Sequence, residues 1–425
     1  MDIIQTNFSF VYYQLNSEGF VEFKYQDEIE VTKKSLLFTI HPVQLVMFFC
    51  KKYIFIIPFE SGAGYRQPIG IINTQTNIFE IKEHAKQYLP AVYAQIKELL
   101  ARHQDLFYTY LENGHECKLA TYMTADHWGH IIRDDLPSMC QMIEKFDINT
   151  IFYRKSAEKY FTYKELFKYA SLDINLREHN QHDNEETLKY CLTNNLYFYK
   201  PYGDKPYAFF LQNFIKNYYK APLKVALKSK VVLLVCKYDY RSPINQLELF
   251  ASIIKFYNEK WKDVTFLIQN YVQPLNSADP LNNPNARPLI EAGDQFFNVL
   301  KSNNPGAGIL NLNNISIKEY INYAQNADMY FSPYGSLQHL SYAFSKGNGI
   351  VYGLYDQKNL TGYGDTTVLL PTEYLTTNEQ YDKIVCGANI NTAFRFKFFN
   401  ERNYEIDIKQ FLGFLEGYHL KNNVE

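Results

Sequence analysis

The sequence predicts an α/β protein with two domains, and three observations support this prediction. The chain has 425 residues, which is too long for one compact core and fits two domains of roughly 200 residues each. Residues 1–80 carry short β-rich runs separated by turn signals. Beyond residue 224, apolar runs alternate with helical patterns, as in parallel strands joined by crossover helices.

The composition is that of an ordinary globular protein, with 46% hydrophobic and 21% charged residues. The formal net charge of −2 gives no electrostatic footprint for DNA or RNA, so no nucleic-acid partner is expected. The six cysteines are widely spaced, without the pairs typical of zinc sites, which predicts free thiols in a reducing cytoplasm. The start MDIIQTNFSF lacks the features of a signal peptide.

The first half of the chain is expected to contain strands, then a helix, then further strands. The runs VQLVMFF and YIFIIPF in residues 43–59 predict two buried strands, because a charged break between them leaves each too short to span a membrane. Short strands are also predicted at 118–123 and 149–154. A helix with one buried stripe is predicted from the spacing of Leu89, Val92, Ile96, Leu99 and Leu100.

The second half is predicted to be a Rossmann-like domain after a hinge near KAPLK, residues 220–224. The run KVVLLVCK is typical of a strand that is buried on both faces. Strands are expected at 230–237, 264–269, 308–312, 327–333 and 349–354. Helices are expected at 245–261, 291–302, from the capping box Ser316–Glu319, at 336–346 and at 404–420.

A strand, a glycine turn and a helix follow one another in MYFSPYGSLQHLSYAF, residues 329–344. Gly335 and Ser336 would present backbone amides at the helix start, where the helix dipole and free N–H groups favour an anion such as phosphate. In an open α/β sheet this position lies at the carboxyl ends of the strands, where ligands bind. A tight glycine turn without a ligand is the alternative.

Two cations and an amide follow the first strand of the second half. Lys237 and Arg241 come after this strand, and Asn245 stands at the start of the next helix. Both cations can face the anion at Gly335, and the planar guanidinium of Arg241 matches phosphate oxygens. Two solvated loop charges are the alternative.

The stretch DHWGHIIRDDLP, residues 126–137, gathers histidines and aspartates on an expected helix. His130 and Asp134 are four residues apart and share a face, so the carboxylate can orient or charge the imidazole. Further candidates in the same stretch are Asp126, His127 and Asp135. A metal site would need more ligands at suitable spacing, and none is expected. An acid/base site and an ordinary solvated helix stay open as interpretations.

In these three places the chain resembles glycosyltransferase family 61. The family's His-x3-Asp-x-Leu-Pro motif falls on His130, Asp134, Leu136 and Pro137. Its basic residues and Arg-x-x-x-Asn, which follow an apolar strand, fall on Lys237, Arg241 and Asn245. Its third motif falls on Ser332, Pro333, Tyr334, Gly335, Ser336 and Leu337, with Tyr334 in place of the usual His and Ser336 in place of the usual Ala.

The resemblance implies a GT-B fold, in which two Rossmann-like domains face a cleft. It implies an acceptor-side domain at 1–222, a nucleotide-sugar-binding domain at 223–395, and a C-terminal helix within 396–425 that packs back on the N-terminal domain. It also implies an inverting glycosyltransferase, with His130 as the first candidate base and Asp134 in support. The implied donor-binding residues are Lys237, Arg241, Asn245, Tyr334, Gly335, Ser336 and Leu337.

No metal or other cofactor is implied, because the sequence lacks the Asp-x-Asp motif of the other large glycosyltransferase fold. Cations and helix amides would then neutralise the donor diphosphate. The expected partners are a nucleotide-sugar, most simply a uridine diphosphate sugar, and a saccharide acceptor. The many Tyr, Phe, Asn, Lys and Ile residues are typical of codon usage in an AT-rich genome. With the resemblance, this favours synthesis of a bacterial capsule or lipopolysaccharide in the cytoplasm. Peripheral contact with the inner membrane stays open.

Two alternatives to this function stay open. One is a GT-B transferase that uses a cytidine monophosphate-linked acidic sugar. The other is a catalytically silent sugar-binding or scaffold protein of the same pathway, for which the changes at Tyr334 and Ser336 leave room.

Overall fold

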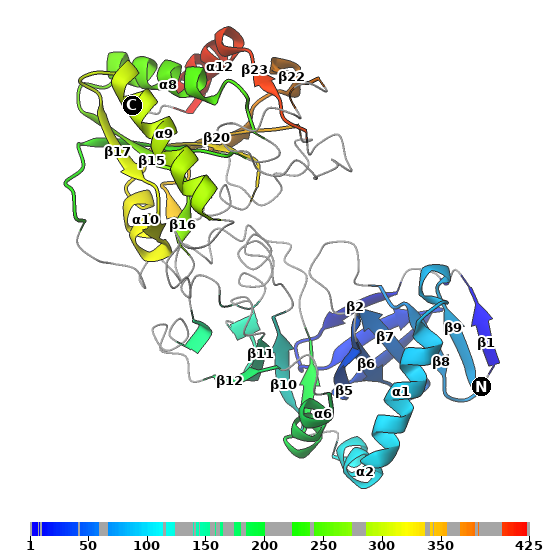
Figure 1. Ribbon diagram of the computed structural model, residues 1–425. Helices are drawn as coiled ribbons and strands as arrows, with labels where there is room; N and C mark the ends of the chain where they lie inside the picture. Colours follow the sequence, from blue (N-terminus) through cyan, green and yellow to red (C-terminus); the bar gives the residue numbers. More distant parts are fainter. Residues whose placement is uncertain are drawn as a thin grey trace. The chain divides into compact units, whose positions relative to one another are not determined.

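Figure 1 shows the protein in a computed structural model of the whole chain. It describes all residues except 1, 7, 9–10, 41–42, 59–66, 114–115, 124–138, 140–141, 144, 154–157, 159–161, 165–173, 180–183, 200–222, 239–241, 274–285, 336–340, 343, 355–365, 379–380, 382–401 and 423–425. The chain divides into unit 1, Met1–Glu158 with Tyr163–Gly203, and unit 2, Lys159–Thr162 with Asp204–Glu425. This division and the predicted boundary at residue 222 differ over Thr162 and over residues that lie outside the described ranges.

Unit 1 begins with antiparallel β structure. A six-stranded sheet has the order β1-β9-β8-β7-β6-β5, in which only β1 and β9 pair in parallel. Its strands are β1 (Asp2–Gln5), β5 (Ser35–Ile40), β6 (Val43–Phe49), β7 (Tyr53–Pro58), β8 (Gly70–Asn73) and β9 (Ile78–Ile81). A three-stranded meander is formed by β2 (Tyr12–Leu15), β3 (Val21–Tyr25) and β4 (Glu28–Thr32). The meander and the sheet share an aromatic core, since the Phe23 and Phe55 rings stack with centroids 4.3 Å apart.

A four-stranded parallel sheet of order β12-β11-β10-β13 completes unit 1. Its strands are β10 (Lys118–Tyr122), β11 (Ile148–Tyr153), β12 (Asn175–Glu178) and β13 (Leu196–Phe198). The helices are α1 (Leu89–Arg102), α2 (Gln104–Glu112) and α6 (Asn184–Thr193), with a short 3-10 helix at Glu83–Ala85. Ser35 joins β5 to β13, because its hydroxyl accepts from the Phe198 N–H at 2.6 Å.

The strands predicted in the first half are confirmed at 43–49, 53–58, 118–122 and 148–153, and so is the buried stripe of α1. The antiparallel region differs from the Rossmann-like domain that the resemblance implies for this half. The physical reason is the short connections, since β6 and β7 are joined by a turn of three residues, which permits a hairpin and excludes a parallel crossover.

Unit 2 is built on a six-stranded sheet in which all pairs are parallel. Its strands are β14 (Lys230–Val235), β15 (Val264–Gln269), β17 (Gly308–Leu312), β19 (Met329–Pro333), β20 (Gly349–Tyr352) and β21 (Thr367–Leu369). They lie in the order β17-β15-β14-β19-β20-β21, which is the 3-2-1-4-5-6 order of a Rossmann domain. The parallel α/β sheet predicted for the second half is confirmed.

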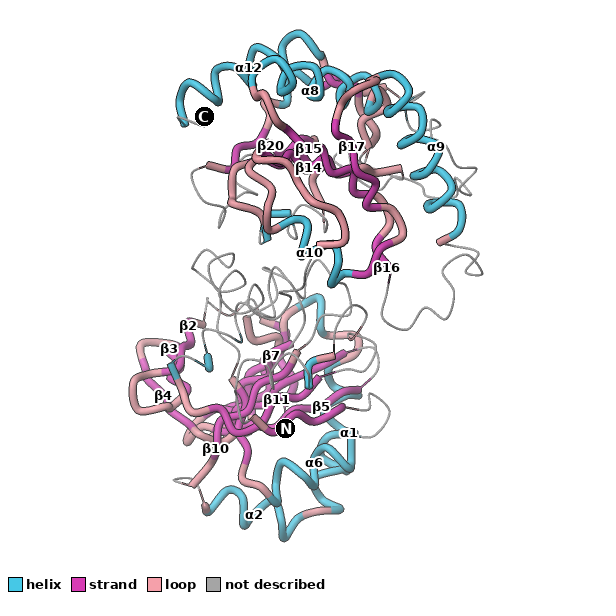
Figure 2. The backbone as a smooth tube through the Cα atoms, turned by 90° about the vertical axis from the view of Figure 1, so that its left-hand side faces the viewer, coloured by secondary structure: helices cyan, strands magenta, loops and turns pink. Residues whose placement is uncertain are grey.

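Helices cover both faces of this sheet (Figures 1 and 2). On one face lie α8 (Gln246–Lys260), α9 (Arg287–Asn303) and α12 (Ile408–Asn422), and α10 (Ile317–Ala324) lies on the other. The Glu319 N–H donates to the Ser316 hydroxyl at 3.2 Å, which confirms the predicted cap of α10. Smaller elements are β16 (Val272–Gln273) paired with β18 (Ile315–Ser316), β22 (Leu375–Thr376) paired with β23 (Glu405–Ile406), and a 3-10 helix at Thr372–Tyr374.

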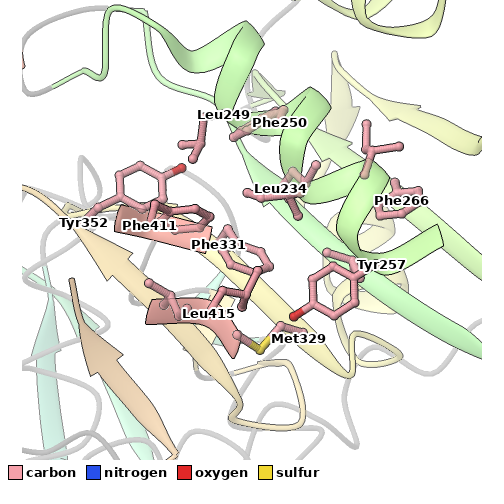
Figure 3. Packing of buried hydrophobic residues seen from close by; sticks show 14 of the residues in the cluster. Leu234, Leu249, Phe250, Tyr257, Phe266, Met329, Phe331, Tyr352, Phe411 and Leu415 are labelled. Carbon is pink, nitrogen blue, oxygen red and sulfur yellow. The ribbon is translucent and has the colours of Figure 1, made fainter. Parts of the chain in front are cut away.

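The C-terminal helix α12 belongs to the core of unit 2. Figure 3 shows Phe411 and Leu415 packed with Phe331 of β19, and both side chains are fully buried. The Tyr257 hydroxyl and His419 Nε2 are hydrogen-bonded at 2.8 Å, which ties α12 to α8. These contacts place the apolar face of α12 in the core of unit 2, and the prediction that the helix packs back on the N-terminal domain stays a prediction.

Two further properties bear on the sequence predictions. Four cysteines lie in the described ranges, and Cys50, Cys117, Cys191 and Cys236 are all free thiols there, as predicted. No helix in the described part of the chain combines the length and the apolar character that a bilayer-spanning segment needs.

Candidate functional site

The strand order of unit 2 creates a switch point between β14 and β19. These strands are neighbours, with Leu233 opposite Tyr330, but the chain leaves them in opposite directions. The connection from β14 leads through α8 to β15, whereas β19 continues to β20 on the other side. In open α/β sheets, ligands bind outside the carboxyl ends of the strands at such a point.

Two of the predicted residues meet at this switch point. Lys237 follows β14, and Gly335 follows β19. A Cβ atom placed on Gly335 would lie 3.7 Å from the Lys237 Nζ, which is the one described heavy atom within 4 Å of that position. Among the described residues, the ammonium group of Lys237 is thus the one side-chain group beside the Gly335 position, and a cation next to backbone amides suits an anion.

The backbone conformation of Gly335 explains why a glycine stands here. Its φ is 153°, a value that residues with a Cβ rarely adopt. The preceding residue is fixed, since the Tyr334 N–H donates to the Tyr352 carbonyl at 2.8 Å and the Tyr334 side chain is largely buried. The turn after β19 is therefore held against the end of β20.

Gln246 supports the Lys237 side of the site and was not predicted. Its Oε1 accepts from the Lys237 N–H at 3.0 Å, and the residue is only 1% exposed. Its Nε2 has no hydrogen-bond partner among the described residues. Leaving a buried donor unsatisfied costs about 1–3 kcal/mol, so this amide is a candidate donor to a bound ligand or water. A polar residue one turn before Leu249 and Phe250, on the buried stripe of α8, was the available signal in the sequence.

Asn245 holds the start of α8 to the C-terminal segment. Its Nδ2 donates to the Ile406 carbonyl at 2.8 Å, and its Oδ1 accepts from the Ile406 N–H at 3.1 Å. The neighbouring Ser242 N–H donates to Asn403 Oδ1 at 3.0 Å. Both polar groups of the Asn245 side chain thus have partners within the protein. Its role in binding a donor stays a prediction, and the contacts described give it a positioning role.

A buried phenol lies behind the turn. Burial, with smaller contributions from Tyr404 and Cys236, raises the pKa of Tyr352 well above its ordinary value. The hydroxyl of Tyr352 therefore stays protonated and uncharged at neutral pH. The Tyr404 hydroxyl donates to the Tyr352 carbonyl at 3.2 Å, so the segment after residue 402 also supports the end of β20.

Several predicted site residues lie outside the described ranges, and their roles stay predictions. They are Asp126, His127, His130, Asp134 and Asp135 of the first motif, Arg241 of the second, and Ser336 and Leu337 of the third. Within the described part of the chain, no cluster of His, Cys, Asp or Glu side chains is placed to hold a metal ion. Metal-independence likewise stays a prediction.

Several solved structures are similar to this chain. Heptosyltransferase WaaC of E. coli with ADP-2-deoxy-2-fluoro heptose is 12% identical, with a TM-score of 0.34 over 60% of this chain and 92% of that chain. The E. coli ADP-heptose lps heptosyltransferase II is 9% identical, with a TM-score of 0.36 over 72% and 99%. The UDP-GlcNAc 2-epimerase of Methanocaldococcus jannaschii is 12% identical, with a TM-score of 0.28 over 68% and 82%.

No family model and no curated protein sequence matches the chain. Because the TM-scores above are low, a functional assignment has to rest on the residues at the switch point and on the sequence motifs.

Proposed function

We propose that the chain is a glycosyltransferase that binds the diphosphate of a nucleotide-sugar at the switch point between β14 and β19. The observation that carries this proposal is the Lys237 ammonium group beside the glycine turn at Gly335, 3.7 Å from the position of an added Cβ. A charge-assisted hydrogen bond of this kind contributes about 1.5–3 kcal/mol. Gln246 Nε2, which has no partner among the described residues, is proposed as a further donor next to the same loop.

The motif resemblance supports sugar transfer as the reaction. Lys237 and Gly335 fall on two separate motifs in which the chain resembles glycosyltransferase family 61, and unit 2 brings them together at the carboxyl ends of β14 and β19. If the two motifs matched by chance, their residues would not be expected to lie close together in the fold. The remaining motif, with His130 and Asp134, supplies the candidate base.

In the proposed inverting mechanism, His130 accepts the proton of an acceptor hydroxyl while the hydroxyl oxygen attacks the anomeric carbon of the donor sugar. The bond between that carbon and the diphosphate oxygen breaks, and the diphosphate leaves with the bonding electrons. Lys237 stabilises the negative charge that develops on the leaving group. Asp134 orients the imidazole, and no metal ion takes part.

We propose a uridine diphosphate sugar as donor and a saccharide hydroxyl as acceptor, in the synthesis of a bacterial capsule or lipopolysaccharide. The test is release of nucleotide from a panel of nucleotide-sugars, with and without saccharide acceptors and with excess chelator. Turnover is expected from a diphosphate sugar and should survive the chelator. Turnover with a cytidine monophosphate sugar alone would contradict the donor class, and binding without turnover would favour the silent sugar-binding alternative.

The His130→Ala variant tests the proposed base. Turnover should fall by roughly 10²–10⁴-fold, the usual contribution of general acid–base catalysis. The dissociation constant for the nucleotide should stay nearly unchanged, because unit 2 is proposed to bind it. Normal turnover in this variant would favour the solvated-helix interpretation of residues 126–137.

A further inference from the structure

Unit 1 contains a cavity of about 500 Å³, and none of its lining residues belongs to the site motifs discussed above. It lies between the turn that joins β4 to β5, the turn that joins β6 to β7, and the end of α2. This volume is in the range of small-molecule sites, which is roughly 300–1,000 Å³. We call it the lysine cavity because its lining includes Lys33, Lys34 and Lys51.

The charges around the lysine cavity are unbalanced. Within the described residues, no carboxylate forms an ion pair with Lys33, Lys34 or Lys51, and Glu112 is the one acidic side chain of the lining. Nearby carboxylates have other partners. Glu28 pairs with Lys52 at 2.6 Å. Glu30 accepts the backbone N–H groups of Lys51 and Lys52 at 2.9 and 3.3 Å.

The thiol in the lining does not offset this positive charge. Burial, followed by the nearby Glu30 carboxylate, raises the pKa of the Cys50 thiol. Cys50 is therefore neutral at physiological pH. The lining thus carries three lysines and one glutamate, with the Glu30 carboxylate close to Cys50, and the excess of positive charge in a concave site favours an anion.

The rest of the lining is mostly apolar. Phe20, Val31, Phe49, Ile54 and Leu111 contribute to it, and Val31 remains 49% exposed. The Lys33 Nζ lies over the Phe20 ring, 4.4 Å from its centroid, so cationic and aromatic surfaces adjoin. A ligand that fills this cavity needs both an anionic group and an apolar part.

The turns that carry the lysines are fixed by hydrogen bonds. The Thr32 hydroxyl donates to the Phe49 carbonyl at 2.7 Å and accepts from the Lys34 N–H at 3.0 Å. The Phe49 N–H donates to the Lys34 carbonyl at 2.9 Å. The backbone is thus arranged before any ligand arrives, which reduces the entropy lost on binding.

We propose that the lysine cavity binds a small organic anion, in which a phosphate, sulfonate or carboxylate is joined to an aromatic or aliphatic group. The anion meets Lys33, Lys34 and Lys51, and the apolar part covers Phe20 and Phe49. A concave site of this volume fits a single small molecule better than the flat surface of a bilayer. This site shares no residue with the site proposed for glycosyl transfer.

The test uses the full chain and the fluorescent probe anilinonaphthalene sulfonate, which is an anion on an apolar aromatic body. The wild type should bind one probe molecule saturably, and para-nitrophenyl phosphate should displace it. The double variant Lys33→Glu with Lys51→Glu should bind the probe at least about tenfold more weakly, since charge-assisted contacts are lost. The matched control Lys24→Glu reverses an exposed lysine on β3, which pairs with Glu22, and should bind like the wild type.

Equal probe affinity in the double variant and the wild type, with unchanged thermal unfolding, would overturn the proposal. Displacement by phosphatidylglycerol vesicles but not by para-nitrophenyl phosphate would overturn it in favour of a membrane surface. A third variant covers the case in which the double variant fails to fold. Phe20→Ala keeps all three lysines, so it should weaken the binding of the probe but not the binding of inorganic phosphate. An unchanged affinity for the probe in this variant would also overturn the proposal.

Discussion

Gly335 and Lys237 define the candidate anion site at the scale of single residues. The glycine has a φ of 153°, so any side chain strains the turn at a cost of about 1–3 kcal/mol. An added Cβ would also approach the Lys237 Nζ to 3.7 Å. Conformation and ligand access therefore both favour glycine at this position.

Gly335→Ala should weaken nucleotide binding by about tenfold or more, because strain moves the turn and a methyl group narrows the approach to the backbone. Calorimetry with uridine diphosphate measures this effect. Gly306→Ala is the matched control, since Gly306 also has a positive φ, 89°, and an added Cβ there would meet nothing within 4 Å. The control should lose stability and keep its affinity. Wild-type affinity in both variants would place the anion elsewhere.

Gln246→Glu tests whether the unpartnered amide faces the ligand. The glutamate still accepts from the Lys237 N–H but replaces the Nε2 donor by a charged oxygen. Affinity for a nucleotide diphosphate should fall by at least about tenfold, because a donor becomes a like charge. Gln325→Glu is the control, since Gln325 Nε2 is also buried without a described partner but caps the end of α10. An equal loss in both variants would indicate a general electrostatic effect.

At the scale of elements, α12 shows what hydrophobic periodicity can and cannot predict. The spacing of Ile408, Phe411 and Leu415 predicts a helix with one buried face, and the helix forms at Ile408–Asn422. The spacing carries no information on which surface covers that face. Here the partner is the core of unit 2 around Phe331 and Tyr257, a contact between residues far apart in the chain.

Phe411→Ala should lower the free energy of unfolding by about 3–5 kcal/mol, the usual cost of truncating a buried phenylalanine. Chemical denaturation measures the change. Leu420→Ala in the same helix is the control, because Leu420 is 83% exposed, and it should change stability by no more than about 0.5 kcal/mol. Equal small effects in both variants would contradict the packing of α12 in unit 2.

The elements of unit 2 could be predicted because its strands are continuous apolar runs and α10 begins with a capping box. Strand order could not, because periodicity does not encode which strand pairs with which. The same limit applies to Asn245, whose partner Ile406 lies 161 positions away. The motif predicts Asn245 as a donor-binding residue. Only the fold shows that its side-chain amide is hydrogen-bonded to Ile406 in the C-terminal segment.

At the scale of the whole molecule, the chain combines two kinds of architecture. Unit 2 is a Rossmann-type sheet with a switch point, and unit 1 joins a parallel sheet to an antiparallel region that carries the lysine cavity. The sequence predicted the switch-point residues Lys237 and Gly335 through motifs and turn chemistry. It did not predict the lysine cavity, because Lys33, Lys34 and Lys51 come from two turns with no recognisable spacing.

The central claim is that unit 2 binds a nucleotide diphosphate at the switch point, and calorimetry on Lys237→Ala tests it most directly. Affinity for uridine diphosphate should fall about ten- to a hundredfold, the loss of one charge-assisted contact. Lys228→Ala is the control, since it removes the same charge just before β14, at the opposite edge of the sheet, where Lys228 pairs with Asp263. This control should bind like the wild type. Wild-type affinity in a folded Lys237→Ala variant would contradict a nucleotide site at this position.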